Sequence, residues 1–464
     1  MTPAAPLQNQ THWRTPSAAT DWPRVGSPQS MTKTDIETQF RSVLDQIGVP
    51  DRFGIAVSGG GDSMALLAMA ARAGLKPSVV TVDHGLRPEA GEEAELVARF
   101  CAQFSLVHTV LRIDALSSGP NLAARARAAR YDALASWASK QRLGTILLGH
   151  TRDDQAETVL LRLARGSGAD GLAAMSPVRE WASIEWVRPL LNIEREDLRQ
   201  WLRAQGIAWA DDPTNEDTSY DRVKIRQVLD DLEALGLTRS RLANTARTMA
   251  RQSVVLQAAG DDLMSRCMRR GDLGAIHLAR EPLVAALPDT GLRVLAKVLQ
   301  IIASAAYRPR LTTLETAMEL IASADFRGTS LAGCVIVPNG DEIVVCREPA
   351  AVSVVPAKTG SQTWDRRWTI TVPEEADFWI APLGKQALAH ATACIRKLGV
   401  QTPNAWMTSV PAARLAVPAL FKTADSAPEA LLAVPMAGLC LDRSVENVTI
   451  TPPDTAHLRH HGPK

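Results

Sequence analysis

Apolar residues follow two different periods in the first half of the chain. Short apolar runs of strand length recur between longer segments whose apolar positions have helical spacing. The predicted strands are residues 53–57, 77–82, 106–113 and 145–148, and the predicted helices are residues 35–48, 64–73, 88–104, 122–141 and 153–165. Strands that alternate with helices predict an α/β fold, with a parallel doubly wound sheet covered by helices on both faces.

The pattern changes after residue 229. A long helical, Arg-rich segment covers residues 238–269, and two more helical segments cover residues 283–306 and 311–323. Two β-like runs then flank Asn339-Gly340, which is typical of a hairpin turn. We therefore expect an α/β domain at residues 31–230, a helical Arg-rich region at 231–325 and a smaller α+β domain at 326–464.

Residues 1–30 are rich in Pro, Ser, Thr and Gln and are predicted to form a disordered tail. Met31 stands just before the first helical pattern and is a candidate start of the protein. No apolar run is long enough to predict a membrane-spanning helix, and the N-terminus lacks the apolar block of a signal peptide.

Composition excludes several classes of protein. The 464 residues suggest two to three domains, and 46% hydrophobic residues with 22% charged residues exclude a disordered chain or a coiled-coil rod. The net charge of +1 gives no overall indication of nucleic-acid binding, so such a partner must be argued from local patches. The six cysteines form no CxxC pair, which favours reduced thiols in a cytoplasmic protein.

A Gly-rich segment follows the first predicted strand and opens a helix; its residues are Ser58, Gly59, Gly60, Gly61, Asp62 and Ser63. Glycines let backbone N–H groups approach a phosphate, and the helix N-terminus adds a positive dipole. The segment lacks the Lys of the usual nucleoside-triphosphate loop and lacks the dinucleotide spacing. Asp62 within an anion site would repel phosphate unless a divalent cation lay between them, so we expect Mg²⁺ at Asp62.

Further polar clusters fall at the carboxyl ends of predicted strands, where parallel sheets bind ligands. They contribute four site-lining candidates without an assigned role, which are Asp83, His84, His150 and Asp153. Asp154 and Glu157 are three residues apart on one helix face, so both can reach one ammonium group. Arg130 and Arg222 can bind a carboxylate or a phosphate through two hydrogen bonds.

The Gly-rich segment resembles the SGGxDS signature of the PP-loop superfamily of N-type ATP pyrophosphatases. Further segments resemble the tRNA(Ile)-lysidine synthase family, at residues 82–87, 121–131, 149–158, 165–172, 188–191, 209–215 and 220–226. Two positions depart from the family pattern: Thr151 stands where a second His is usual, and Val223 where Asn is usual.

The resemblance implies that ATP adenylates the wobble cytidine of the isoleucine tRNA with a CAU anticodon. Free L-lysine then displaces AMP and leaves lysidine, which changes decoding from AUG to AUA. The resemblance assigns ATP binding to the Gly-rich segment, and lysine binding and catalysis to Arg130, Asp154, Glu157 and Arg222. Asp62 is expected to take part in catalysis because, with Mg²⁺, it would neutralise the phosphate charge. It also implies that the C-terminal domain helps to select the tRNA.

Other functions remain to be weighed against this one. A tRNA cytidine thiolase would need cysteines for an iron–sulfur cluster, but only Cys101 lies in the α/β domain. A glutamine-dependent amidotransferase would need a glutaminase segment, which is missing. A non-catalytic RNA-binding protein on this fold would be expected to lack Asp62 or the acidic pair. Arginines between residues 239 and 270 are candidates for tRNA phosphate contacts, and the oligomeric state is left open.

Overall fold

The computed structural model describes residues 33–83, 90–113, 122–211, 221–271, 273–305, 307–372, 378–397, 409–422, 425–426, 431–433 and 449–451. The chain forms two compact units, Met1–Val254 and Val255–Lys464. The segment expected to be disordered, residues 1–30, lies outside the described residues.

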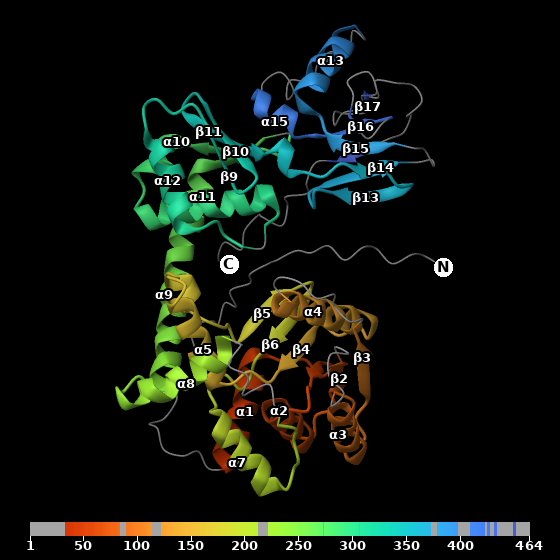
Figure 1. The fold of residues 1–464 in the computed structure, drawn as a ribbon, viewed down its shortest axis with the longest axis vertical. Helices are drawn as coiled ribbons and strands as arrows, with labels where there is room; N and C mark the ends of the chain where they lie inside the picture. Colours follow the sequence, from red (N-terminus) through yellow and green to blue (C-terminus); the bar gives the residue numbers. More distant parts are fainter. Residues whose placement is uncertain are drawn as a thin grey trace. The chain divides into compact units, whose positions relative to one another are not determined.

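The first unit is built on a six-stranded sheet (Figure 1). Its strands are β1 Gly54–Ala56, β2 Ser78–Asp83, β3 His108–Arg112, β4 Thr145–Leu148, β5 Val178–Trp181 and β6 Ile184–Val187, in the order β3-β2-β1-β4-β6-β5. Neighbouring strands are parallel, except that β5 is antiparallel to β6 at one edge. The parallel α/β fold predicted from the sequence is confirmed.

Helices cover both faces of this sheet, because successive residues of a strand point to opposite sides. Ile55 packs with α1 Lys33–Ile47, α2 Gly61–Arg72, α3 Ala90–Gln103 and α7 Arg195–Gln205. Its neighbour Ala56 packs on the other face with α4 Leu122–Lys140. Figure 1 shows α4 on the side of the sheet opposite α1, α2 and α7.

A smaller apolar cluster joins three helices of the same unit. Ala156 and Val159 of α5 Arg152–Leu163 pack against α8 Asp221–Ala234 and the first half of α9 Arg239–Cys267, while α6 Ala169–Leu172 precedes β5. The contacts on α9 come from Leu242 and Ala246. The position of α5 therefore depends on α9, which begins 76 positions after α5 ends.

The sequence pattern did not predict the β5–β6 hairpin or the helices α6, α7 and α8 of the first unit. The hairpin turns at Ala182 and Ser183, which both have positive φ (53° and 59°), without the Gly or Asn that usually indicates such a turn. The short strands on either side have four residues each, which is too few to show a clear period.

The described residues of the second unit form three antiparallel sheets. The first has the order β7-β8-β11-β10-β9 and consists of β7 Met268–Arg270, β8 Ile276–Ala279, β9 Thr329–Leu331, β10 Cys334–Asn339 and β11 Glu342–Arg347. It packs against α10 Arg280–Ala285, α11 Pro288–Ala303 and α12 Leu311–Ala322. The hairpin predicted around Asn339-Gly340 is present, with Asn339 paired to Glu342 and Gly340 at φ 60°.

Strands from both sides of residue 326 share this first sheet, because β8 pairs with β11. The region expected to be helical, residues 231–325, thus also contains β7 and β8. Their three and four residues are too few for the alternation of a strand to be seen in the sequence.

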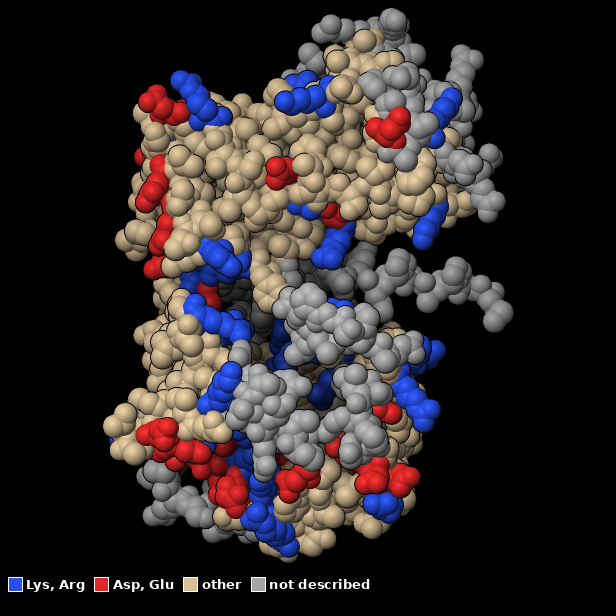
Figure 2. Space-filling model, in the orientation of Figure 1, with Lys and Arg blue, Asp and Glu red and all other residues tan. Residues whose placement is uncertain are grey.

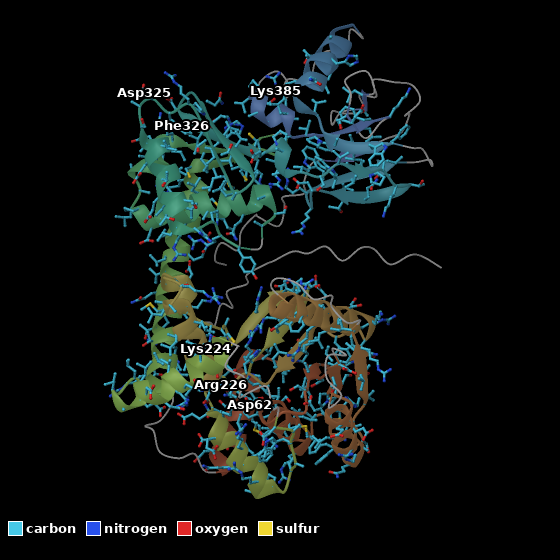
Figure 3. The ribbon with its side chains drawn as sticks, in the orientation of Figure 1. Asp62, Lys224, Arg226, Asp325, Phe326 and Lys385 are labelled. Atoms are coloured by element: carbon cyan, nitrogen blue, oxygen red, sulfur yellow. The ribbon has the colours of Figure 1, made fainter. Side chains whose placement is uncertain are left out.

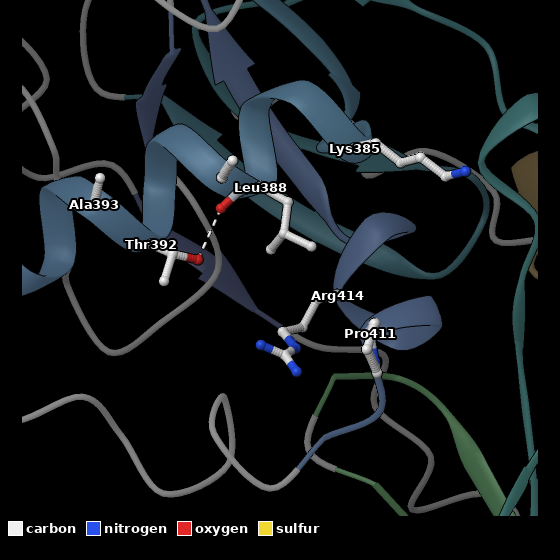
Figure 4. A pocket seen from close by; sticks show the side chains of 7 residues that line it. Lys385, Leu388, Thr392, Ala393, Pro411 and Arg414 are labelled. Atoms are coloured by element: carbon white, nitrogen blue, oxygen red, sulfur yellow. Dashed lines mark hydrogen bonds between the residues drawn. The ribbon is translucent and has the colours of Figure 1, made fainter.

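The two remaining sheets and α13 Gly384–Lys397 pack around one apolar cluster. The 3₁₀ turn Pro349–Ala351 precedes the first strand of these sheets. They are β12-β15-β16-β17 and β13-β14-β18, from β12 Val355–Pro356, β13 Gly360–Trp364, β14 Trp368–Val372, β15 Trp379–Pro382, β16 Pro418–Phe421, β17 Leu431–Ala433 and β18 Thr449–Thr451. Between α13 and α15 Pro411–Leu415 lies a groove of about 360 Å³ (Figure 4). Lys385 and Arg414 line it, and the side chains around them are Leu388, Ala389, Thr392, Ala393 and Pro411.

No helix among the described residues is long and apolar enough to cross a membrane.

Candidate functional site

The strand order of the first sheet reverses between β1 and β4, which are neighbours. The chain leaves β1 toward β2 on one side and leaves β4 toward β6 on the other. Ligands of open α/β sheets bind at this kind of reversal, in the crevice beyond the carboxyl ends of the strands. The Gly-rich segment follows β1, and the polar residues from His150 to Glu157 follow β4, so both border this crevice.

Hydrogen bonds within the Gly-rich segment hold it as a tight turn. The Ser63 hydroxyl donates to the carbonyl of Gly60 (2.9 Å), and the backbone N–H of Ser58 donates to Ser63 Oγ (3.1 Å). Gly59 has φ 87°, a conformation that favours glycine. The turn ends at Gly60, the N-cap of α2, so the first turn of that helix faces the crevice.

Gly149 brings the second segment close to the first. A Cβ at this position would lie 2.9 Å from the backbone oxygen of Asp62, so only glycine allows the two segments to approach this closely. The residues that begin α5 are therefore held beside the start of α2.

The start of α5 is fixed by Thr151 and Asp154. The backbone N–H and the hydroxyl of Thr151 both donate to Asp154 Oδ2, at 2.8 and 2.9 Å. Thr151 thus caps the helix at the position where the family usually has His. Although burial favours the neutral acid, Arg195 and the Thr151 donors hold the pKa of Asp154 below its usual range.

Glu157 is the most buried carboxylate of the group, with 1% of its side chain exposed. Its Oε1 accepts a hydrogen bond from Arg226 Nε of α8 at 2.7 Å. Its Oε2 is buried and has no hydrogen-bond partner. Figure 3 labels Arg226 and Asp62, which lie on α8 and α2 at this part of the first unit.

Arg195, the first residue of α7, connects the acidic side chains. Its Nε donates to Asp62 Oδ2 at 2.9 Å, its Nη2 lies 3.3 Å from Asp154 Oδ1, and its Nη1 lies 3.5 Å from Glu157 Oε1. Its backbone N–H donates to Asp153 Oδ2 at 2.8 Å. Although burial opposes the charge, Asp62 and Asp154 raise the pKa of Arg195 above its usual value.

The pKa of Asp62 is higher than that of an ordinary aspartate, so its neutral form persists to higher pH. Burial, with a smaller contribution from Asp154, raises its pKa to about 6 against the attraction of Arg195. Its Oδ1 is buried without a hydrogen-bond partner, while Oδ2 is bound to Arg195. A buried carboxylate oxygen without a donor costs free energy and is well suited to a cation.

The residues present fit the Mg²⁺ ion expected at Asp62. Mg²⁺ is commonly held by one or two carboxylates together with waters and substrate phosphates, so it does not need a complete protein cage. The described residues accordingly contain no group of three or more His, Cys, Asp or Glu arranged around one metal position.

Basic side chains lie around His150 at the end of β4. Burial, together with nearby Arg188, Arg127 and Arg130, lowers the pKa of His150 to about 3, so the imidazole is neutral. Arg130 forms no hydrogen bond or ion pair with another described side chain, whereas Arg188 donates to the carbonyl of Ser176 at 2.9 Å. The crevice therefore has an acidic side at α5 and a basic side at α4.

Fewer contacts are described for the other site residues that were predicted from the sequence. Asp153 accepts a hydrogen bond from the backbone N–H of Arg195 at the start of α7, and it also pairs with Arg239 Nε of α9 at 3.2 Å. Asp153 therefore connects α5 to α7 and to α9. Asp83 ends β2, beside β1. Arg222 lies in the first turn of α8, four residues before Arg226, but its side chain is outside the described part of the chain, as is His84.

Arg195 and Arg226 are the two site residues that sequence reasoning did not select. Arg226 ends the segment at residues 220–226 that carries the family resemblance, and its spacing of four from Arg222 was a usable signal. Arg195 had no such signal, because it lies outside every quoted segment.

Comparison with known proteins agrees with this geometry. Residues 32–232 match the PP-loop domain family. A tRNA(Ile)-lysidine synthase from Ruegeria pomeroyi is 40% identical over 395 residues, which cover 84% of this chain and 90% of that protein. The synthases of Hyphomonas neptunium (38% identical, 68% and 86% covered) and Wolbachia pipientis (31% identical, 76% and 84% covered) are also similar. The predicted resemblance is confirmed: the chain belongs to the tRNA(Ile)-lysidine synthase family of ATP-dependent, carbon–nitrogen bond-forming ligases.

Proposed function

We propose that the protein ligates free L-lysine to the 2-position of the wobble cytidine in the isoleucine tRNA with a CAU anticodon. The cytosine 2-keto oxygen attacks the α-phosphorus of ATP, and pyrophosphate leaves. The lysine amine then attacks C2 of the adenylated base, loses a proton, and AMP leaves with the oxygen. Lysidine at this position changes decoding from AUG to AUA, in a cytoplasmic setting.

One observation carries this proposal. The carboxylate of the phosphate loop, Asp62, and the carboxylates of α5 lie together at the strand-order reversal, joined through Arg195. A site for ATP phosphates therefore borders a site for a cationic amine. A lysine-transferring reaction needs both sites within reach of one reacting base.

The roles follow from the charges. The N–H groups of the turn at residues 58–63 bind the phosphates that leave. Mg²⁺, held by Asp62, would offset the negative charge that develops on the α- and β-phosphates. Asp154 and Glu157 handle the lysine ammonium group, while Arg130 and Arg222 bind the lysine carboxylate or a phosphate.

The tRNA would bind partly through arginines of α9. Arg239 pairs with Asp153 and Glu233, and Arg266 with Asp262, so these cations are already committed to carboxylates. Arg241 and Arg251 are exposed and bind only neutral groups among the described residues. These two are the better candidates for phosphate contacts.

The second unit would contribute to choosing the tRNA. The described lining of its α13–α15 groove includes Lys385 and Arg414 and no acidic side chain, which suits a phosphate backbone. On the face shown in Figure 2, basic and acidic side chains are interspersed, so RNA contacts there would depend on individual cations rather than on one large patch.

The deciding experiment supplies ATP, Mg²⁺, radiolabelled L-lysine and a CAU-anticodon isoleucine tRNA transcript. We expect label in the RNA, with one AMP and one pyrophosphate released per lysine. The matched control transcript has a UAU anticodon and offers no wobble cytidine, so it should stay unlabelled. Asp62→Ala should abolish labelling, whereas Asp45→Ala, an exposed position on α1, should not.

The same assay separates the alternatives. RNA that gains no lysine but gains sulfur from a sulfur donor would indicate a thiolase instead. The structure disfavours that outcome, because burial raises the pKa of Cys101 to about 11 and keeps its thiol protonated. Binding of tRNA without AMP release would indicate a non-catalytic RNA-binding protein.

A further inference from the structure

A single guanidinium links the phosphate loop to the acidic helix. We propose that Arg195 is a positioning residue, which holds Asp62 and Glu157 so that each keeps one oxygen for a ligand. This inference rests on the proposed function, since the ligands are taken to be Mg²⁺ and the lysine ammonium group.

The hydrogen bonds of the Asp62 and Glu157 carboxylates support this proposal, because each carboxylate has one bound and one unbound oxygen. Arg195 binds Oδ2 of Asp62 at 2.9 Å, and it shares Oε1 of Glu157 (3.5 Å) with Arg226 (2.7 Å). The remaining oxygens, Asp62 Oδ1 and Glu157 Oε2, are both buried and have no hydrogen-bond partner. Buried acceptors are normally satisfied in folded proteins. Two unsatisfied carboxylate oxygens on the two sides of one cation therefore indicate two positions for incoming cations.

Asp154 differs from its neighbours, because both of its oxygens are already used. Oδ2 accepts from Thr151, and Oδ1 faces Arg195 at 3.3 Å. We therefore infer that Asp154, besides the role proposed for it at the lysine ammonium group, helps to hold Arg195, and that Glu157 offers the free oxygen.

The guanidinium is itself held firmly. Asp153 accepts the backbone N–H of Arg195 at the first turn of α7, and the buried Leu198 and Trp201 of that helix pack in the same core as α2. A planar guanidinium offers five N–H donors in fixed directions and can serve three carboxylates at once, whereas the ammonium of lysine is a point charge. Only arginine fits this role.

The test compares Arg195→Ala and Arg195→Lys with the wild type and with Arg203→Ala. Arg203 lies on the same helix, is 55% exposed and pairs with Glu196. For Arg195→Ala we expect the half-saturating concentrations of lysine and of Mg²⁺ in lysidine formation to rise about tenfold or more. Arg195→Lys should lie between this variant and the wild type, and Arg203→Ala should stay within about twofold of the wild type.

A measurement without turnover complements the assay. Equilibrium dialysis of labelled ATP at increasing Mg²⁺, without lysine or tRNA, should give a higher half-saturating Mg²⁺ for Arg195→Ala. Melting temperatures of all variants distinguish loss of folded protein from loss of positioning. If Arg195→Ala does not fold, the same comparison is made with Arg195→Lys.

Unchanged half-saturating concentrations in a folded Arg195 variant would overturn the inference, as would a change for only one of the two ligands. These results differ from failure of the proposed function, in which the wild type itself would form no lysidine.

Discussion

At the residue scale, the carboxylates of the crevice differ in their pKa and in the number of oxygens that lack a hydrogen-bond partner. Burial and neighbouring acids raise the pKa of Asp62 to about 6, while Arg195 and Thr151 keep Asp154 ionised. Glu157 is shielded from water and pairs with two arginines through one oxygen. The chemistry of each acid is therefore set by its neighbours rather than by its residue type.

Glu157→Gln tests the amino-acid site. The amide keeps the shape of the side chain but removes the charge, so the half-saturating concentration of lysine should rise about tenfold or more with little change for ATP. The measurement is steady-state lysidine formation at varied lysine. Glu95→Gln, at an exposed position of α3, is the control, and an unchanged lysine requirement in Glu157→Gln would remove Glu157 from this site.

His150 should make the protein less stable in mild acid. Its folded-state pKa of about 3 lies below the ordinary value of 6.5, so below pH 6.5 the unfolded chain binds a proton that the folded protein does not. The free energy of unfolding should fall by about 2 kcal/mol between pH 7 and pH 5 from this group. His150→Gln should remove that part of the decline in urea unfolding, and identical pH profiles for the two proteins would contradict it.

At the element scale, the site is assembled by helices that begin at the crevice. The first turns of α2, α5 and α7 supply Asp62, Asp154 and Arg195, and α8 adds Arg226. Of these helices, α2 and α7 pack in the core of the sheet, whereas α5 and α8 pack in the α5–α8–α9 apolar cluster. Close packing at the sheet is thus a condition for the geometry of the site.

Gly54→Ala tests this dependence. A Cβ on Gly54 of β1 would lie 2.8 Å from the ring of Trp137 on α4, so the helix or the ring must move. We expect the free energy of unfolding to fall by about 1–3 kcal/mol, measured by urea unfolding. Gly144→Ala has open space around its Cβ and negative φ, so it should change stability much less, and equal effects would contradict the packing argument.

At the scale of the whole molecule, α9 belongs to both compact units. Its first half packs through Leu242 and Ala246 against α5 and α8, and Leu263 near its end lies in the core of the second unit. The first unit accordingly extends to Val254, although the PP-loop match ends at residue 232. The domain boundaries predicted near residues 231 and 326 stay predictions, because they divide the chain by expected function and not by packing.

Two arginines of α9 provide a matched test of tRNA binding. Among the residues that the structure describes, Arg251 has only a neutral partner, Thr248, whereas Arg266 pairs with Asp262 at 2.9 Å. Arg251→Ala should weaken tRNA binding several-fold and reduce the slope of log affinity against log salt by about 1. Arg266→Ala should change both less. Filter binding at several salt concentrations measures this, and a steeper or unchanged slope for Arg251→Ala would contradict a phosphate contact.

The sequence by itself determined the features that depend on neighbours in the chain. The alternation of apolar runs predicted the sheet, and the residues from Ser58 to Ser63 predicted the phosphate loop, because a turn between a strand and a helix is a local structure. The spacing of Asp154 and Glu157 placed both on one helix face for the same reason.

Only the tertiary structure decided which cations meet these acids. Arg195 reaches Asp62 across 133 positions, and Arg226 reaches Glu157 across 69, so no local pattern could pair them. The β5–β6 hairpin was hidden because its turn uses Ala182 and Ser183, whose positive φ is imposed by strand pairing and not by residue preference. Burial, which raises the pKa of Asp62, likewise exists only once the helices and the sheet have packed together.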